Sequence, residues 1–362
     1  MKRNLLSPRR FWLTVVQRHA VSAVVACSAI LWALSTLHAT HGWGASPGGE
    51  VVVYTSLDQF YSEPILKRFE KETGIIVRPR YDTEATKTTG LFNRLVAERG
   101  RPRCDVFWNN EVLRTVALKR MGLLQPYASP RALDIPETFK DRDGFWTGFA
   151  ARARVIVFNT DRLTSTAAPR SIFDLAQPRR RGQTAMSYPL FGTMATHGAA
   201  LFALLGDDKA RSFFRSLRDN EIQVLDGNAL VVKTVARGEL AAGLTDTDDV
   251  YSAQLDGKPV AFVVPDQRPG EIGALVIPNT LGLVRDCPHP DAGRKLIDFL
   301  LDPGVENELA AARSAQIPVR PNGAPSKTGI DLSRIRPMTF DYEKAAAALE
   351  TSAPFFQDLF AR

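Results

Sequence analysis

The stretch VVVYTSLDQFYSEPILKRFEKETGIIV, residues 51–77, begins with a short apolar strand that turns into a polar loop at Thr55 and Ser56. An amphipathic helix follows, with Ile65 and Phe69 on one face, and then a second apolar strand. This order of elements predicts parallel strands joined by crossover helices. Because ligands in such α/β folds bind at the carboxyl ends of strands, Thr55 and Ser56 are candidate ligand-binding residues.

Length and charge limit the classes of protein to consider. The chain of 362 residues is long enough for two domains, each with its own core. Its formal net charge of +7 comes mostly from residues 1–49, which hold five basic side chains and no acidic one. The remaining residues carry 41 basic and 39 acidic side chains, so the charge gives no support for nucleic-acid binding.

Residues 1–49 have the parts of an export signal or membrane anchor plus linker: a basic region, an apolar run at 20–37 and a glycine-rich exit. Arg9 and Arg10 resemble a twin-arginine signal, and Cys27 resembles a lipoprotein cysteine but lies inside the apolar run. The run is almost long enough to span a bilayer, so retention as an uncleaved anchor stays open. We expect an exported protein in the periplasm or another extracytoplasmic compartment.

A second group of strand-to-helix junctions begins near residue 150. The segment TAMSYPLFGTMATH, residues 184–197, predicts a strand, a loop and a helix whose first turns carry Gly192, Thr193 and Thr196. A helix N-terminus with free N–H groups can bind an anion, although a threonine there is more often an ordinary cap.

The sequence TDTDD follows a short apolar strand at 240–245 and places Asp246, Asp248 and Asp249 at the start of a helix. One aspartate at that position is explained as an N-cap. Three aspartates in four residues exceed this need and repel one another unless a cation, an amine or arginines neutralise them. We interpret these aspartates as part of a ligand site, with a purely capping role as the alternative.

Several segments in the same order resemble bacterial periplasmic solute-binding proteins of ABC importers, in the ferric-iron-binding (type 2) branch. They are YTSLDQFYSEPILKRFEKETGI, CDVFWNNE, GFAARARVIVFNT, ARGELAAGLTDTDD and GALVIPNTLGLV. The resemblance implies an α/β, two-lobe periplasmic-binding-protein fold with an interlobe cleft and a hinge. It implies that lobe I comprises residues 50–149 and 270–312, and that lobe II comprises residues 150–269 and 313–362.

The resemblance also points to metal ligands that this sequence has replaced. The adjacent tyrosines of the family fall on Asp248 and Asp249, its histidine falls on Asp58, and its glutamate falls on Asn110, beside Glu111. Carboxylates suit hard cations such as Fe³⁺ and also suit ammonium groups. The implied metal ligands are Asp58, Asp248 and Asp249, and the implied cargo is Fe³⁺, another hard cation, or a small charged or zwitterionic solute.

The function that follows is that of the extracytoplasmic substrate-binding component of an ABC importer. Such a protein is expected to be a monomer without a resident cofactor, to close on its ligand, and to present the closed form to a permease in the cytoplasmic membrane. An exported metal-dependent enzyme with a DxD-like site at Asp246 and Asp248, and a membrane-tethered ligand sensor, are the alternatives. The predicted ligand-binding residues are Thr55, Ser56, Asp58, Asn110, Glu111, Thr193, Thr196, Asp246, Asp248 and Asp249.

The resemblance also implies a position for two cysteines. In the fold that the chain resembles, the returning strand at 280–284 runs antiparallel to lobe I strands such as 105–108. This arrangement brings Cys104 toward Cys287, and export places both thiols in an oxidising compartment. We expect a disulfide between them, with two separate buried cysteines as the alternative.

Overall fold

The computed structural model describes residues 49–82, 88–321 and 323–361. These residues belong to the compact unit Gly48–Arg362, and the fold below is the fold of that unit. The predicted export signal or membrane anchor, including Arg9, Arg10 and Cys27, lies outside the described residues. Within the described part of the chain, we find no helix whose length and hydropathy match those of a membrane span.

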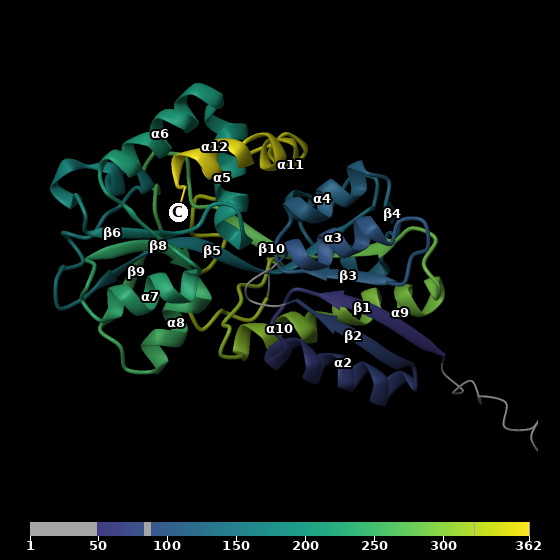
Figure 1. Ribbon diagram of the computed structural model, residues 1–362. Helices are drawn as coiled ribbons and strands as arrows, with labels where there is room; N and C mark the ends of the chain where they lie inside the picture. Colours follow the sequence, from purple (N-terminus) through teal and green to yellow (C-terminus); the bar gives the residue numbers. More distant parts are fainter. Residues whose placement is uncertain (1–48, 83–87, 322, 362) are drawn as a thin grey trace, which may run out of the picture. The chain divides into compact units, whose positions relative to one another are not determined.

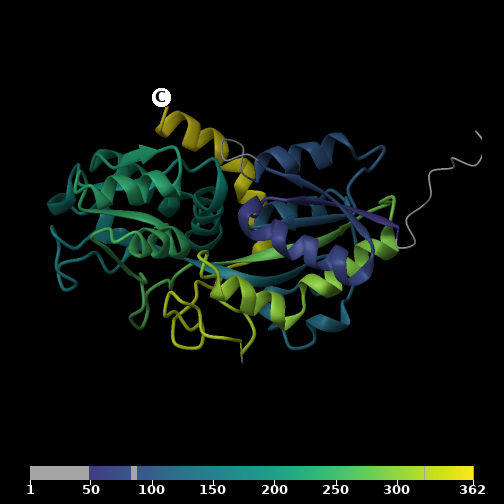
Figure 2. The same cartoon turned by 90° about the horizontal axis from the view of Figure 1, so that it is seen from below.

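Lobe I is built on a sheet in which β1, β2 and β3 are parallel and β10 runs antiparallel to β3. Helices α2, α9 and α10 lie on one face of this sheet, and α3 and α4 lie on the other (Figure 1). Seen from below, α2, α9 and α10 lie together in front of the strands (Figure 2). The bounds are β1 (Glu50–Thr55), α2 (Gln59–Thr73), β2 (Ile76–Tyr81), α3 (Thr89–Ala97), β3 (Val106–Asn109), α4 (Leu113–Arg120), β4 (Leu124–Gln125), η2 (Pro130–Ala132), η3 (Glu137–Phe139), β10 (Val276–Val284), α9 (Pro290–Leu300) and α10 (Pro303–Ala311).

Lobe II continues the sheet, so that the strands of the described residues follow the order β2-β1-β3-β10-β5-β8-β6-β7. Helices α5 and α6 lie on one face of the lobe II strands, and α7 and α8 lie on the other (Figure 1). The bounds are β5 (Thr147–Asn159), η4 (Ile172–Ala176), η5 (Pro178–Arg180), β6 (Thr184–Ser187), α5 (Gly192–Leu205), α6 (Asp207–Asp219), β7 (Gln223–Leu225), α7 (Asn228–Ala236), β8 (Ala242–Asp246), α8 (Thr247–Leu255), β9 (Val260–Val263), α11 (Tyr342–Thr351) and α12 (Ala353–Leu359).

Strand β5 joins the two lobes, and every residue of it is buried. Its first half pairs with β10, ending at the Ala153–Val276 pair, and its second half pairs with β8, starting at the Arg154–Asp246 pair. The chain crosses between the lobes in β5, returns at the start of β10 and crosses again between α10 and α11, and the first two crossings pair with each other in the sheet. Two such crossings are the connection that a hinge requires. The predicted residue boundaries of the lobes stay a prediction.

The C-terminal helix α11 contacts both lobes rather than lobe II alone. It packs against α5 of lobe II and against α4 of lobe I. A small apolar cluster at this junction includes Val116 of α4, Ala199 of α5 and Ala345 of α11. This cluster therefore joins α4 of lobe I to α5 and α11 at the junction between the lobes.

The two predicted disulfide partners are buried free cysteines, so the disulfide is not formed in this structure. The antiparallel pairing of β10 with β3 matches the arrangement that the resemblance implied, but the register does not align the two thiols. Leu283 pairs with Val106, which places Arg285 opposite Cys104 and leaves Cys287 two residues further along. The Sγ of Cys104 lies 3.1 Å from the carbonyl oxygen of Val106.

We predict that both thiols are unreactive in the folded protein. Burial raises the pKa of Cys104 well above its usual value, and burial followed by the charge of Asp105 raises the pKa of Cys287 to about 12. The thiolate is the reactive species, so a thiol reagent at pH 8 should modify neither residue. In a Cys27→Ser variant, denaturation without reductant should expose two reactive thiols per chain. Finding none after denaturation would show that a disulfide forms.

Candidate functional site

A cavity of about 100 Å³ lies between the two lobes. From lobe I it is lined by residues at the start of α2 and after β3, including Asp58 and Asn110, and from lobe II by the first residues of α5, α7 and α8. Strands β6, β7 and β8 are parallel, so their carboxyl ends meet at one edge, and the three helices begin just beyond that edge. Ligands of α/β proteins bind at this kind of edge.

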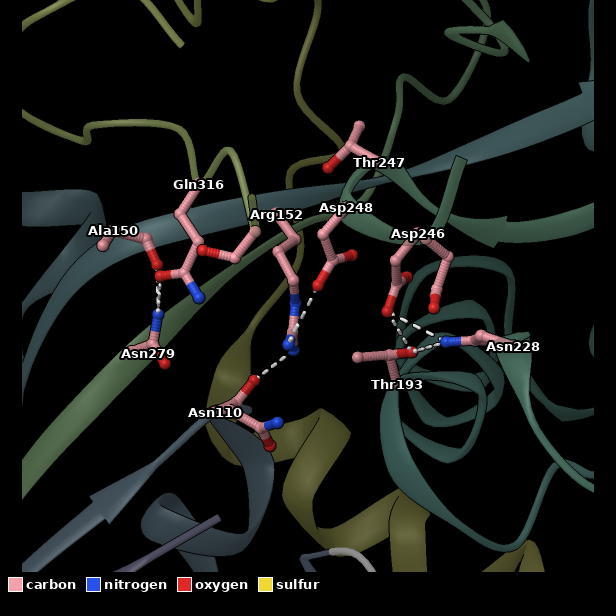
Figure 3. A network of polar contacts seen from close by, with 12 residues as sticks. Asn110, Ala150, Arg152, Thr193, Asn228, Asp246, Thr247, Asp248, Asn279 and Gln316 are labelled. Atoms are coloured by element: carbon pink, nitrogen blue, oxygen red, sulfur yellow. Dashed lines mark hydrogen bonds and ion pairs between the residues drawn. The ribbon is translucent and has the colours of Figure 1, made fainter. Parts of the chain in front are cut away.

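Asp246, the last residue of β8, is held by a buried network of hydrogen bonds (Figure 3). Its Oδ1 accepts from Nη1 of Arg154 at 2.7 Å, and its Oδ2 accepts from Thr193 Oγ1 at 2.7 Å and from Asn228 Nδ2 at 2.9 Å. Burial raises the pKa of Asp246, but the guanidinium groups of Arg154 and Arg152 lower it by more, so the carboxylate stays ionised. Asp246 therefore fixes the starts of α5 and α7 against β5.

Arg152 reaches from β5 toward both lobes (Figure 3). Its Nη2 donates to the carbonyl oxygen of Asn110 in lobe I, and its Nη1 lies 3.9 Å from Oδ2 of Asp248 in lobe II. Burial lowers the pKa of Arg152, but the carboxylates of Asp248, Asp246 and Asp249 raise it by more. Its side chain is the charged group around which the acidic residues of the cavity are arranged.

The acidic residues predicted as metal ligands do not all converge on one point. Asp248 and Asp249, in the first turn of α8, can each bring a carboxylate oxygen within 4.8 Å of an oxygen of Asp246. Among the described residues this is the group with metal-like spacing, and Asp58 is not part of it. Asp58 lies at the N-cap position of α2 and lines the cavity from the other lobe. The sequence predicts the grouping of the three aspartates of TDTDD, and the metal-ligand role of Asp58, Asp248 and Asp249 stays a prediction.

Thr55 and Ser56 do not line the cavity and instead shape the loop after β1. The Oγ1 of Thr55 accepts from the backbone N–H of Leu57 at 3.1 Å, and the Oγ of Ser56 donates to Asn109 Oδ1 at 2.8 Å. Both side chains are buried. Their hydroxyl groups form hydrogen bonds with polar groups of the protein itself. These residue types at a strand end therefore serve the structure of the loop here and not the binding of a ligand.

Glu111 and Thr196 contact each other across the lobes, away from the cavity lining. Glu111 accepts from the backbone N–H groups of Leu113 and Arg114 at 2.7 and 2.9 Å, and so caps the start of α4. Thr196 of α5 donates to the same carboxylate at 2.8 Å. These two predicted site residues form a buried hydrogen bond that links lobe I to lobe II.

Sequence reasoning missed the two arginines that organise the site. The strand segment ARARVIV places Arg152 and Arg154 among apolar residues of a strand that is fully buried. A buried charged side chain is stable only when it is paired with an opposite charge or hydrogen-bonded. Two arginines in an apolar strand, together with the acidic TDTDD segment, could have indicated that the arginines pair with these aspartates. Asp226, Asn228 and Gln316 also line the cavity: Asp226 follows the short strand β7, Asn228 begins α7, and Gln316 lies in an irregular segment.

The fold and the cavity define a two-lobe binding protein of the α/β class. The family model described as "Bacterial extracellular solute-binding protein" matches residues 112–342, and the chain belongs to this family. Members of the family work outside the cytoplasm and bind solutes, so the extracytoplasmic class predicted from the sequence is confirmed.

Known proteins resemble the chain over most of its length. The Fe(3+)-binding periplasmic protein of Serratia marcescens is 27% identical over 214 residues, which cover 59% of this chain and 62% of that protein. Iron-bound HitA from Pseudomonas aeruginosa superposes with a TM-score of 0.75 at 21% identity and covers 86% of this chain and 99% of its own. AfuA from Actinobacillus pleuropneumoniae, with fructose-6-phosphate bound, gives a TM-score of 0.73 at 22% identity and covers 85% and 98%. Both structural matches confirm the two-lobe fold.

We predict that His197 makes stability fall as the pH drops. This residue of α5 is buried, and burial followed by the charge of Arg154 lowers its pKa to about 3. Between pH 6.5 and 3 the unfolded chain binds a proton at this histidine that the folded chain does not, so the free energy of unfolding decreases with decreasing pH. The loss between pH 6.5 and 4.5 should be roughly 2 to 3 kcal/mol.

Urea denaturation at both pH values should give that difference in the wild type, and a smaller one in His197→Leu. Asp246 contributes little to this difference, because its pKa in the fold is lowered from 3.8 and its stabilisation is lost only when the pH falls below about 4. An equal pH dependence in both proteins would contradict the assignment to His197.

Proposed function

We propose that the chain is the substrate-binding component of an ABC importer, and that it captures a small solute with a net positive charge in the cavity between the lobes. Family membership supports the first part, and the names of relatives that bind Fe³⁺ are consistent with the second. The protein acts by binding, closure and release as a monomer, with a permease in the cytoplasmic membrane as its partner. The leader directs it to the periplasm.

The charge of the cavity is the observation that carries this proposal. Arg152 is the cationic side chain among the described residues that line it, and Arg154 lies behind it, paired with Asp246 at 2.7 Å. Of the described residues that line the cavity, five carry carboxylates and one carries a guanidinium group. Such a cavity attracts cations and repels anions. The five lining carboxylates are those of Asp58, Asp226, Asp246, Asp248 and Asp249.

Two classes of cargo fit a negative cavity: a hard cation such as Fe³⁺, and an organic cation. An anionic cargo such as the fructose-6-phosphate held by AfuA would place further negative charge beside these five carboxylates. The alternative of a DxD-like metal enzyme would need Asp246 as a metal ligand, and both oxygens of Asp246 already accept hydrogen bonds from Arg154, Thr193 and Asn228. A binding role without a chemical step is therefore the better account.

Closure can be explained by contacts that the two lobes already share. The hinge consists of β5 and the connection into β10, while the Arg152–Asn110 and Thr196–Glu111 hydrogen bonds join the lobes on either side of it. A cargo that contacts Asp58 of lobe I and Asp248 of lobe II would stabilise the closed form because it interacts with both lobes only there.

We predict that Asp248→Asn weakens cargo binding roughly tenfold or more, which corresponds to about 1.4 kcal/mol. The substitution keeps the shape of the side chain but removes one of the negative charges that face the cargo. The matched control is Asp256→Asn, at the exposed C-terminal end of the same helix, which should leave the affinity unchanged. Titration calorimetry with the cargo that co-purifies with the protein measures both. Unchanged or tighter binding by Asp248→Asn would contradict a cationic cargo.

We predict that Thr196→Val favours the open form. The variant removes the hydrogen bond between the lobes and leaves Glu111 with its bonds to the start of α4. The free-energy difference between the closed and open forms should therefore shift toward the open form by roughly 1 to 2 kcal/mol. Small-angle scattering should give a larger radius of gyration without cargo, and cargo affinity should fall several-fold. Thr115→Val removes the buried Thr115–Thr280 bond inside lobe I and should leave the radius of gyration unchanged. Equal radii for the two variants would contradict this role of Thr196.

A further inference from the structure

We infer that Ala150 and Ala315, in the first and third crossings between the lobes, are pivots of the hinge, and that their left-handed backbone stores free energy in the closed form. This stored free energy opposes closure of the empty protein. The inference concerns the regulation of the cavity and rests on the proposed function. It follows from three features of the two alanines: their backbone angles, their positions between the cores of the lobes, and the side chains that hold their peptide groups.

Both alanines adopt a backbone conformation that is unfavourable for a residue with a Cβ atom. The φ angles of Ala150 and Ala315 are +42° and +43°, in the left-handed region. There the Cβ atom lies too close to a carbonyl oxygen, and alanine has no polar side-chain atom that could offset the cost with a local hydrogen bond. Both residues are fully buried. Such strain persists only where the surrounding structure enforces it, and it is concentrated at functional and switching sites.

Each alanine lies where the chain passes from the core of lobe I to that of lobe II. In the first crossing, Ala151 belongs to the core of lobe I and Ala153 to a core cluster of lobe II. In the third crossing, Leu309 belongs to the core of lobe I, and Ile317 belongs to the same cluster of lobe II. Domain rotations are absorbed by a few residues at such points. The two left-handed residues therefore occupy the positions that a hinge requires.

The two crossings are also joined directly beside the alanines. Ala151 and Ile317 form an antiparallel bridge in which each backbone N–H donates to the other residue's carbonyl oxygen at 2.7 Å. Ala150 comes directly before one partner of this bridge, and Ala315 lies two residues before the other. Because the bridge holds the crossings in register, a rotation at one alanine has to be accompanied by a rotation at the other.

Buried side chains hold the peptide groups of both alanines. The N–H of Ala150 donates to Glu306 Oε1 at 2.8 Å, and its carbonyl oxygen accepts from Asn279 Nδ2. The carbonyl oxygen of Ala315 accepts from Ser326 Oγ at 2.6 Å. The three side chains that make these bonds are buried. These contacts provide the enforcement that a left-handed alanine needs.

The pivots lie next to the cavity as well. Arg152 is two residues after Ala150, Gln316 follows Ala315, and both of these neighbours line the cavity. Two hydrogen bonds already join the lobes in this structure, so the backbone angles are those of a closed form. A molecule that binds to both lobes adds free energy that offsets the stored strain, and the empty protein lacks this contribution. The strained pivots therefore favour the open form until the cavity is filled.

Glycine at either pivot tests the inference, because glycine adopts the left-handed conformation without this cost. Ala150→Gly and Ala315→Gly should each shift the empty protein toward the closed form, by about fivefold to tenfold in the equilibrium constant. Small-angle scattering on protein freed of bound molecules by unfolding and refolding should give each variant a smaller radius of gyration than the wild type. The matched control is Asp286→Gly, with a φ of +53° in the turn after β10, which should leave the radius unchanged.

Ser326→Ala tests the same equilibrium in the opposite direction. This variant removes the hydrogen bond that holds the carbonyl group of Ala315, so the empty protein should open and its radius of gyration should increase. Urea denaturation of each variant shows whether it is folded. Opposite changes of the radius in the glycine variants and in Ser326→Ala distinguish an effect on the hinge from a general loss of stability.

Three results would overturn the inference. A radius of gyration equal to or larger than that of the wild type in folded Ala150→Gly and Ala315→Gly would show that the closed form stores no such strain. An equal decrease in Asp286→Gly would remove the link to the hinge. Failure of both pivot variants to fold would contradict the relief of strain by glycine. Because no solute is added, these results leave the proposed function standing, and the titration of Asp248→Asn tests that function separately.

Discussion

The ion pair between Arg154 and Asp246 is the interaction on which the site depends. Its atoms lie 2.7 Å apart, and its side chains are 0% and 4% exposed. Burying two charges is costly, and the cost is offset only when the remaining lone pairs and protons are also satisfied. Thr193 and Asn228 supply those partners and are the second residue of α5 and the first residue of α7. The pair therefore holds two helix starts and the end of β8 against the strand that joins the lobes.

Fixing Asp246 in this way decides what the neighbouring carboxylates can do. Asp246 is held by hydrogen bonds within lobe II, and Asp248 and Asp249, in the first turn of α8, line the cavity together with Asp58 of lobe I. Arg152, two residues before Arg154 on the same strand, points to the cavity side and reaches Asn110. One strand thus supplies two arginines with different positions. Arg154 is paired with Asp246 in the protein interior, and Arg152 lines the cavity.

Much of the framework could be predicted from local sequence. The apolar strands, the amphipathic helices and the cluster of polar residues at strand ends follow from short-range patterns, and Gly74 ends α2 in the left-handed conformation that its position requires. Asp246 and Asp248 look equivalent in TDTDD, yet the pairing of Asp246 with Arg154 of β5 assigns them different roles. No local pattern carries that information, because it depends on contacts between residues about ninety positions apart.

Contacts between distant parts of the chain explain the other differences between the predicted and the observed roles of residues. Thr196 and Glu111 have the residue types of a ligand site, but in the fold they form a hydrogen bond with each other. Cys104 precedes β3 and Cys287 follows the neighbouring strand β10, but an offset of two residues leaves their thiols unpaired. Arg152 and Arg154 were visible in the sequence, and only the three-dimensional neighbours of β5 show what each one binds.

The most direct test of this account is native mass spectrometry of the protein purified from the compartment in which it works. The account predicts one small cargo per chain whose mass identifies a molecule with a net positive charge at neutral pH. A co-purified cargo with a net negative charge would contradict the central claim that the arginines of β5 leave a negative cavity for a cation.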